Sequence, residues 1–204
     1  MSSDKKKSLE KILSHKTKNI TLSDVVKKYF NELLFENLIS KDSSLLPITY
    51  LLKSNLSSLL SLNKYQLVKL INYLSLYDLV KEMKYLVDTK YLKKIYSFLT
   101  SDEKKFLNKI LKYNEPFSTK RLNLEKFNLE KKTIRNILHK RGLERLAYAI
   151  SSQNEDFIWY IMHFLDIGRA MILEKLIRKN KNLGISDIII SQIFYVLENN
   201  MSNL

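Results

Sequence analysis

Three histidines are the residues in this sequence best suited to metal binding or proton transfer: His15, His139 and His163. Zinc and iron sites on helices use a second ligand three or four residues away. Only His163 has such a neighbour, Asp166, and one imidazole with one carboxylate does not complete a site. We therefore expect His163 to be a partly buried structural or interface residue, and we expect no metal and no cofactor.

Nucleophile and phosphate-binding motifs are also missing from the sequence. The chain has no cysteine, which excludes disulfides, thiolate metal sites and a cysteine nucleophile. Its glycines, Gly142, Gly168 and Gly184, are isolated, so they form no phosphate-binding loop, and each is expected at a helix boundary or cap. No Gly-x-Ser-x-Gly elbow and no distinctive carboxylate pair occurs. The sequence predicts a protein that is not an enzyme.

A cluster of basic side chains is the strongest candidate binding site. Positions 131, 135 and 139 share one face of a helix, so the cluster predicts a positive stripe. The stripe would dock an acidic protein or a phosphate backbone, and the alternative is an ordinary solvated face. No aromatic residue interleaves the stripe, which disfavours recognition of bases by stacking. The cluster consists of Lys131, Lys132, Arg135, His139, Lys140, Arg141 and Arg145.

The charge of the whole chain widens the choice of partners. The formal net charge is +14, typical of proteins that meet nucleic acid, anionic lipid or an acidic protein. Only six of the 35 basic residues are arginine, the residue expected where phosphates are gripped in a fork. Nucleic-acid binding, for example in plasmid or chromosome maintenance, is therefore the alternative function. Residues 1–20 form a lysine-rich arm, which suggests peripheral contact with an anionic membrane as a third hypothesis.

Length and composition favour a helical protein. Of 204 residues 45% are hydrophobic, and three glycines and two prolines are too few for a turn-rich β-sandwich. No stretch reaches the roughly 18 apolar residues that span a bilayer, and the N-terminus has no apolar signal segment. We expect a cytoplasmic protein, which would meet the inner face of the cytoplasmic membrane through its basic arm.

One helical pattern occurs twice, at residues 61–116 and 128–180, which we call the first and second units. The offset between them is 67 positions, and it becomes 66 after the first helix. Thr100 and Asp166 correspond, and both are good helix N-caps. Other matched pairs are Leu67 with Ile134, Leu70 with Ile137, Ile71 with Leu138, Tyr91 with Phe157, and Phe98 with Phe164.

The pattern predicts four short helices in each unit, preceded by N-terminal helices within residues 21–60 and followed by a closing helix at 185–200. Units this short bury their apolar faces by stacking on a neighbour. The predicted fold is therefore all-α, an armadillo/HEAT-like right-handed superhelical array with a tandem repeat.

The second unit also contains an ordered set of motifs. They are TIRNIL at residues 133–138, LERLAYAI at 143–150, FLDIGRA at 164–170, LEKL at 173–176 and LGISDI at 183–188. Their order and spacing resemble the C-terminal helical domain of the flagellar motor switch protein FliG. The resemblance covers about residues 128–200, and the first unit is a more distant copy.

This resemblance implies a divergent or truncated relative in the flagellar motor or a related secretion base, with rotor or export components as protein partners. Arg169 matches the arginine of the family's turn motif. At other charged positions of the family this chain has Ser151, Leu176 and Ile177, so a charge-based contact with the stator is not expected. The leading prediction is a non-catalytic scaffold that does not generate torque.

Overall fold

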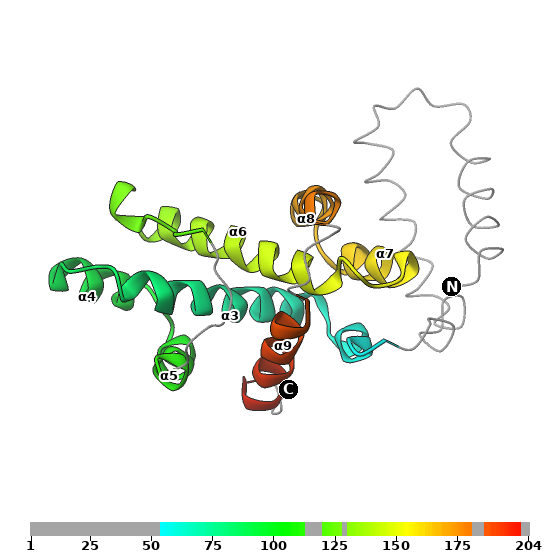
Figure 1. Cartoon of the computed structure of the whole chain (residues 1–204), viewed down its shortest axis with the longest axis horizontal. Helices are drawn as coiled ribbons and strands as arrows, with labels where there is room; N and C mark the ends of the chain where they lie inside the picture. Colours follow the sequence, from blue (N-terminus) through cyan, green and yellow to red (C-terminus); the bar gives the residue numbers. More distant parts are fainter. Residues whose placement is uncertain (1–53, 113–119, 128–129, 181–185, 201–204) are drawn as a thin grey trace, which may run out of the picture.

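The computed structural model describes residues 54–112, 120–127, 130–180 and 186–200. Within these ranges every regular element is a helix, so the prediction of an all-α protein is confirmed (Figure 1). The predicted basic arm and most of the predicted helices at 21–60 lie outside the described residues. The elements are η2 (Ser57–Ser61), α3 (Lys64–Met83), α4 (Thr89–Ser97), α5 (Ser101–Ile110), η3 (Leu124–Lys126), α6 (Lys131–Ile150), α7 (Glu155–Phe164), α8 (Ile167–Asn180) and α9 (Ser186–Asn200).

Helices α3 and α6 form the centre of the molecule, where they lie side by side and run in opposite directions (Figure 1). Each has 20 residues. Residues 73–80 of α3 are buried without a break, as expected of a helix covered on all its faces. The prediction of four short helices per unit is therefore wrong at this point, because the first part of each unit is one continuous helix.

Gly142 explains how closely the two central helices approach. A Cβ atom at this position would lie 1.9 Å from the carbonyl oxygen of Ile71, so only a residue without a side chain fits. Gly142 thus lies in the middle of α6 and not at a helix boundary, which corrects the expectation from sequence. Ser75, which occupies the corresponding position of α3, is also small and is buried.

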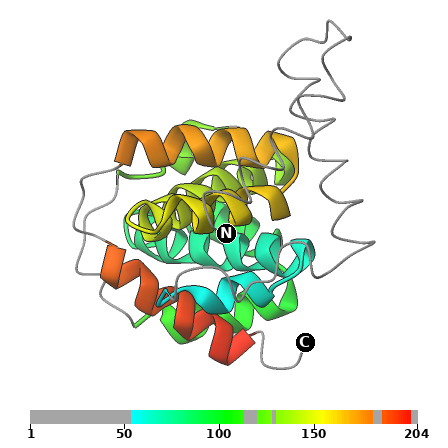
Figure 2. The same ribbon diagram turned by 90° about the vertical axis from the view of Figure 1, so that its right-hand side faces the viewer.

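The remaining helices cover this central pair. Helix α5 packs on the side of α3 away from α6, and α8 packs on the side of α6 away from α3 (Figure 1). Figure 2 shows α8 and α9 on opposite sides of the pair, and α9 contacts both α3 and α6. In both units a long helix is followed by two shorter ones at nearly equal spacing. A superhelical array of the armadillo/HEAT kind is not confirmed by this packing.

Side-chain caps fix several of the helix ends. The Thr100 hydroxyl accepts from the Glu103 backbone N–H at 3.2 Å, and the Glu103 carboxylate accepts from the Thr100 N–H at 2.8 Å. This capping box confirms the predicted start of α5. Asp166 caps α8 as predicted, because its Oδ1 accepts from the backbone N–H of Arg169 at 3.1 Å. A second capping box at Asn63 starts α3.

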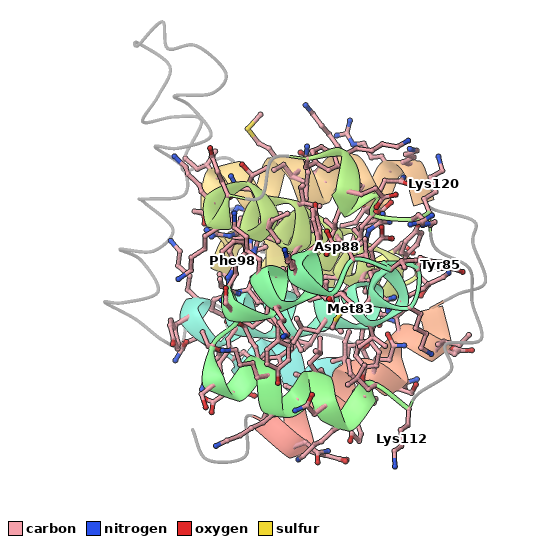
Figure 3. All side chains as sticks on the ribbon, turned by 90° about the vertical axis from the view of Figure 1, so that its left-hand side faces the viewer. Met83, Tyr85, Asp88, Phe98, Lys112 and Lys120 are labelled. Atoms are coloured by element: carbon pink, nitrogen blue, oxygen red, sulfur yellow. The ribbon has the colours of Figure 1, made fainter. Side chains whose placement is uncertain are left out.

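The chain segment that leads to α6 is held by the end of α3. The buried Glu82 carboxylate accepts from the backbone N–H groups of Leu122, at 3.1 Å, and Leu124, at 3.2 Å. Arg121 donates to Glu82 at 3.3 Å, and its guanidinium lies over the ring of Tyr85, 4.6 Å from the centroid. Figure 3 views this end of the molecule, with Tyr85 labelled near its surface. In the described residues, no helix is both long and apolar enough to cross a membrane.

Candidate binding groove between helices α6 and α8

The predicted basic stripe is not a single exposed surface, because Arg145 is fully buried. Its Nε donates to Oδ2 of Asp78 at 2.5 Å, and its Nη1 donates to Oε1 of Gln192 at 2.7 Å. The guanidinium also lies over the Tyr77 ring, 5.5 Å from the centroid. Arg145 therefore joins α3, α6 and α9 internally, and its assignment to a docking surface is wrong.

Two further arginines of the stripe form ion pairs with carboxylates of the same chain. Arg135 grips both carboxylate oxygens of Glu103, at 2.6 and 2.8 Å. Burial opposes ionisation of Glu103, but the hydrogen bonds and charge of Arg135, together with the hydrogen bonds from Thr100, outweigh burial and lower the pKa of the Glu103 carboxyl. Arg141 donates to Glu144 at 2.8 Å and to the backbone carbonyl of Lys120 at 2.9 Å. The charges of Arg135 and Arg141 are thus largely compensated, and both side chains hold other elements in place.

Lys131, Lys132 and Lys140 are the members of the stripe that remain exposed. Lys131 and Lys132 belong to the first turn of α6. Lys140 and the half-buried His139 instead line a groove between α6 and α8. The structure therefore separates the stripe into an internal set, an exposed helix end and part of a groove.

The groove has a volume of about 480 Å³ and lies along one side of α6. Ile137, Leu143 and Ile172 give it an apolar lining, and Phe127, which is 45% exposed, stands beside it. Polar groups from both helices complete it. The full lining is Phe127, Thr133, Asn136, Ile137, His139, Lys140, Leu143, Asp166, Gly168, Arg169 and Ile172.

A chain of hydrogen bonds crosses the groove from α8 to α3. Arg169 forms an ion pair with Asp166, and its Nε donates to Nε2 of His139 at 2.7 Å. Because Nε2 accepts, the proton of the neutral imidazole is on Nδ1, which donates to Oδ1 of Asn72 at 2.8 Å. His139 lies inside α6. Both of its ring nitrogens are occupied, so it is not a free general base.

Burial and hydrogen bonding in this network determine the charges of His139 and Asp166. Burial lowers the pKa of His139, and the positive charge of Arg169 lowers it further, so the imidazole is neutral. Burial opposes ionisation of Asp166, but the backbone and side-chain hydrogen bonds from Arg169 outweigh it and lower the pKa of the carboxyl. Asp166 and Arg169 balance each other, and Lys140 leaves the groove with a net positive charge. The arrangement is suited to binding and not to proton transfer.

The third histidine has a local structural role. His163 lies in α7, where its Nδ1 is 2.7 Å from the Trp159 carbonyl oxygen and its ring stacks on that of Trp159 at 3.8 Å between centroids. It is partly buried, as expected. No group of three or more His, Cys, Asp or Glu side chains that could hold a metal occurs in the described parts of the chain.

Sequence reasoning missed the partners that the first unit supplies to the second. Asn72 bonds to His139 and Asp78 bonds to Arg145, and in both pairs the two residues are 67 positions apart. This separation equals the offset of the repeat predicted from the sequence. The predicted repeat could therefore have indicated these contacts. Positions that correspond between the two central helices, and that carry complementary polar groups, are candidates for hydrogen bonds.

The positions compared with the FliG family are placed as follows. Arg169 is half-buried in the groove, Ser151 donates to the carbonyl of Tyr148 at 3.1 Å, and Ile177 is buried in the core. Leu176 packs against that core. No protein-family model, curated protein or solved structure matches this chain.

Proposed function

We propose that this chain is a non-catalytic helical scaffold that binds another protein through the groove between α6 and α8. The observation that carries the proposal is the combination of an apolar lining with a charged edge in one concave site. Ile137 and Ile172 offer apolar contact, while Lys140 and Arg169 offer hydrogen-bond donors. Binding surfaces typically combine a few apolar anchors with polar groups that fix orientation.

The rigidity of the groove supports a role in binding. Arg169 is held by Asp166 and His139, and His139 is held in turn by Asn72 of α3. A side chain fixed in this way loses little conformational freedom when a partner binds, which improves affinity. The groove is thus preorganised by contacts that reach from the second unit to the first.

The kind of partner follows from the FliG-like motif spacing of the second unit. We propose a rotor or export component of a flagellar motor or related secretion base, met in the cytoplasm. Hydrophobic and hydroxyl side chains at Ser151, Leu176 and Ile177 favour assembly without torque generation. We also propose that the two units form a tandem repeat with an armadillo-like arrangement.

Co-elution tests the proposal. The purified full chain is mixed with purified rotor and export components, and complexes are separated by size-exclusion chromatography. We expect one component to co-elute, and we expect Ile172→Glu or Lys140→Glu to abolish the complex. Lys94→Glu is the matched control, because Lys94 is an exposed lysine on α4, away from the groove. Failure of every component to co-elute, with motility unchanged when the gene is deleted, would refute the proposal.

A further inference from the structure

We infer that the groove between α6 and α8 receives an acidic amphipathic helix of the partner protein, packed as α9 packs on the first unit. The inference rests on the proposed function and specifies the kind of segment that binds. It comes from comparing corresponding positions of the two units: in the part of the chain that the structure describes, a helix covers one of these places and none covers the other.

In the first unit the corresponding place is covered. Phe106 of α5 is fully buried, and its ring packs edge-on against Tyr73 with 5.0 Å between centroids. Tyr195 of α9 lies against the same ring at 6.1 Å. Figure 1 shows α9 beside α3 and α5, where its last residues line a cavity together with Tyr73. Helix α9 therefore covers the junction of α3 with α5.

In the second unit the equivalent residues are uncovered. Ile172 corresponds to Phe106 and is only partly buried, and Lys140 corresponds to Tyr73 and is exposed. Both line the open groove. Among the described helices none lies across α6 and α8 as α9 lies beside α3 and α5 (Figures 1 and 2). The groove thus corresponds to the surface of the first unit on which α9 packs, but no described helix packs on it.

Charge determines which helix fits. The sequence of α9, SDIIISQIFYVLENN, contains two carboxylates and no lysine or arginine. The open groove is more positive than its counterpart, because Lys140 replaces Tyr73 and Arg169 replaces Glu103. A partner helix with apolar residues at positions i, i+3 or i+4 and i+7, and with Asp or Glu beside them, would complement this groove. A basic helix would be repelled.

The helix comes from another protein and not from α9 of a second copy. Ile189, Ile193 and Val196 of α9 are fully buried within their own chain. Gln192 of the same helix accepts from the buried Arg145. Releasing α9 to fill a neighbour's groove would expose these side chains and leave Arg145 without one of its acceptors, so α9 is retained in place.

Peptide selection tests the inference directly. A displayed library of random 15-residue peptides is selected on the full chain, and enriched peptides are measured by fluorescence anisotropy and circular dichroism. We expect enriched sequences to be amphipathic, acidic and poor in Lys and Arg, and to gain helicity when bound. Affinity should fall at least tenfold with Lys140→Glu, and should change less than twofold with the matched variant Lys94→Glu.

The outcomes separate this inference from the proposed function. Enrichment of extended or basic peptides, affinities that do not depend on Lys140, or no enrichment at all would overturn the acidic helix. If a rotor or export component nevertheless co-elutes in a Lys140-dependent manner, the proposed function stands and only the inference of an acidic helix is rejected. Thermal unfolding of each variant confirms that a loss of binding is not a loss of folding.

Discussion

Arg145 and Asp78 form an ion pair at the centre of the molecule, with Nε and Oδ2 2.5 Å apart and side-chain exposures of 0% and 2%. Gln192 of α9 completes the cluster by accepting from Arg145 at 2.7 Å. Each of the three residues belongs to a different helix. The cluster therefore fixes the register of α3, α6 and α9 relative to one another.

Breaking this pair should be costly. Arg145→Met removes the buried cation that bonds the Asp78 carboxylate at 2.5 Å and leaves it only the more distant Arg141 at 4.0 Å among the ion pairs of the described residues, and we expect the free energy of unfolding to fall by about 3–5 kcal/mol. Urea denaturation followed by circular dichroism measures the change. The double variant Asp78→Leu with Arg145→Met removes both charges of the pair, so much of the stability should return. Equal losses in the single and double variants would show that packing, not charge, is responsible.

Gly142 should be nearly irreplaceable. In Gly142→Ala the new methyl group would meet the Ile71 carbonyl oxygen, and the two central backbones would have to separate. We expect a loss of about 3 kcal/mol or more in the free energy of unfolding, measured by urea denaturation. Gly168→Ala is the control, since its nearest neighbour is Oδ1 of Asp166 at 3.5 Å, an ordinary contact. That variant should change stability by less than about 0.5 kcal/mol.

Glu82 should control the segment that precedes α6. Glu82→Ala removes the acceptor of two buried backbone N–H groups and of Arg121, and we expect it to cost about 2–4 kcal/mol. Hydrogen exchange should accelerate specifically at the amides of Leu122 and Leu124. Glu125→Ala is the comparison, because Glu125 is exposed and its ion pair is with the exposed Arg121. Unchanged exchange at these two amides in Glu82→Ala would contradict the role.

His139 should make stability depend on pH. Its pKa in the folded chain is lowered by burial and by Arg169, so the unfolded chain binds the proton more readily. This contribution to stability is fully present above the ordinary pKa of 6.5, and it is lost as pH falls through the lower pKa of the folded state. His139→Gln should flatten the dependence. Denaturation at several values between about pH 7.5 and 5.5 tests this, and identical slopes in both proteins would count against it.

Local sequence signals predicted the helical class and several helix ends. Thr100 and Asp166 are recognisable as caps because the groups they bond to are only three residues away. Helix length was predicted less well. Gly142 suggested a helix boundary in the second unit, but α6 continues through this position because Gly142 lies against the Ile71 backbone.

The binding groove was predicted only in part, because charge alone does not show which side chains find partners. Lys140 and His139 were in the basic cluster, and both line the groove. Arg135 and Arg145 belonged to the same cluster, yet their carboxylate partners lie 32 and 67 positions away. Such pairs depend on which helix faces meet, and helical periodicity does not determine that.

The central packing of α3 and α6 also has a consequence for synthesis on the ribosome. Residues 73–80 of α3 are all buried in the folded chain, yet their principal cover, α6, begins at Lys131. A ribosome that adds roughly 5–20 residues per second exposes this apolar stretch for several seconds before α6 emerges. During that interval the nascent chain carries an uncovered hydrophobic helix, which makes it a substrate for chaperones that bind such segments until translation supplies α6.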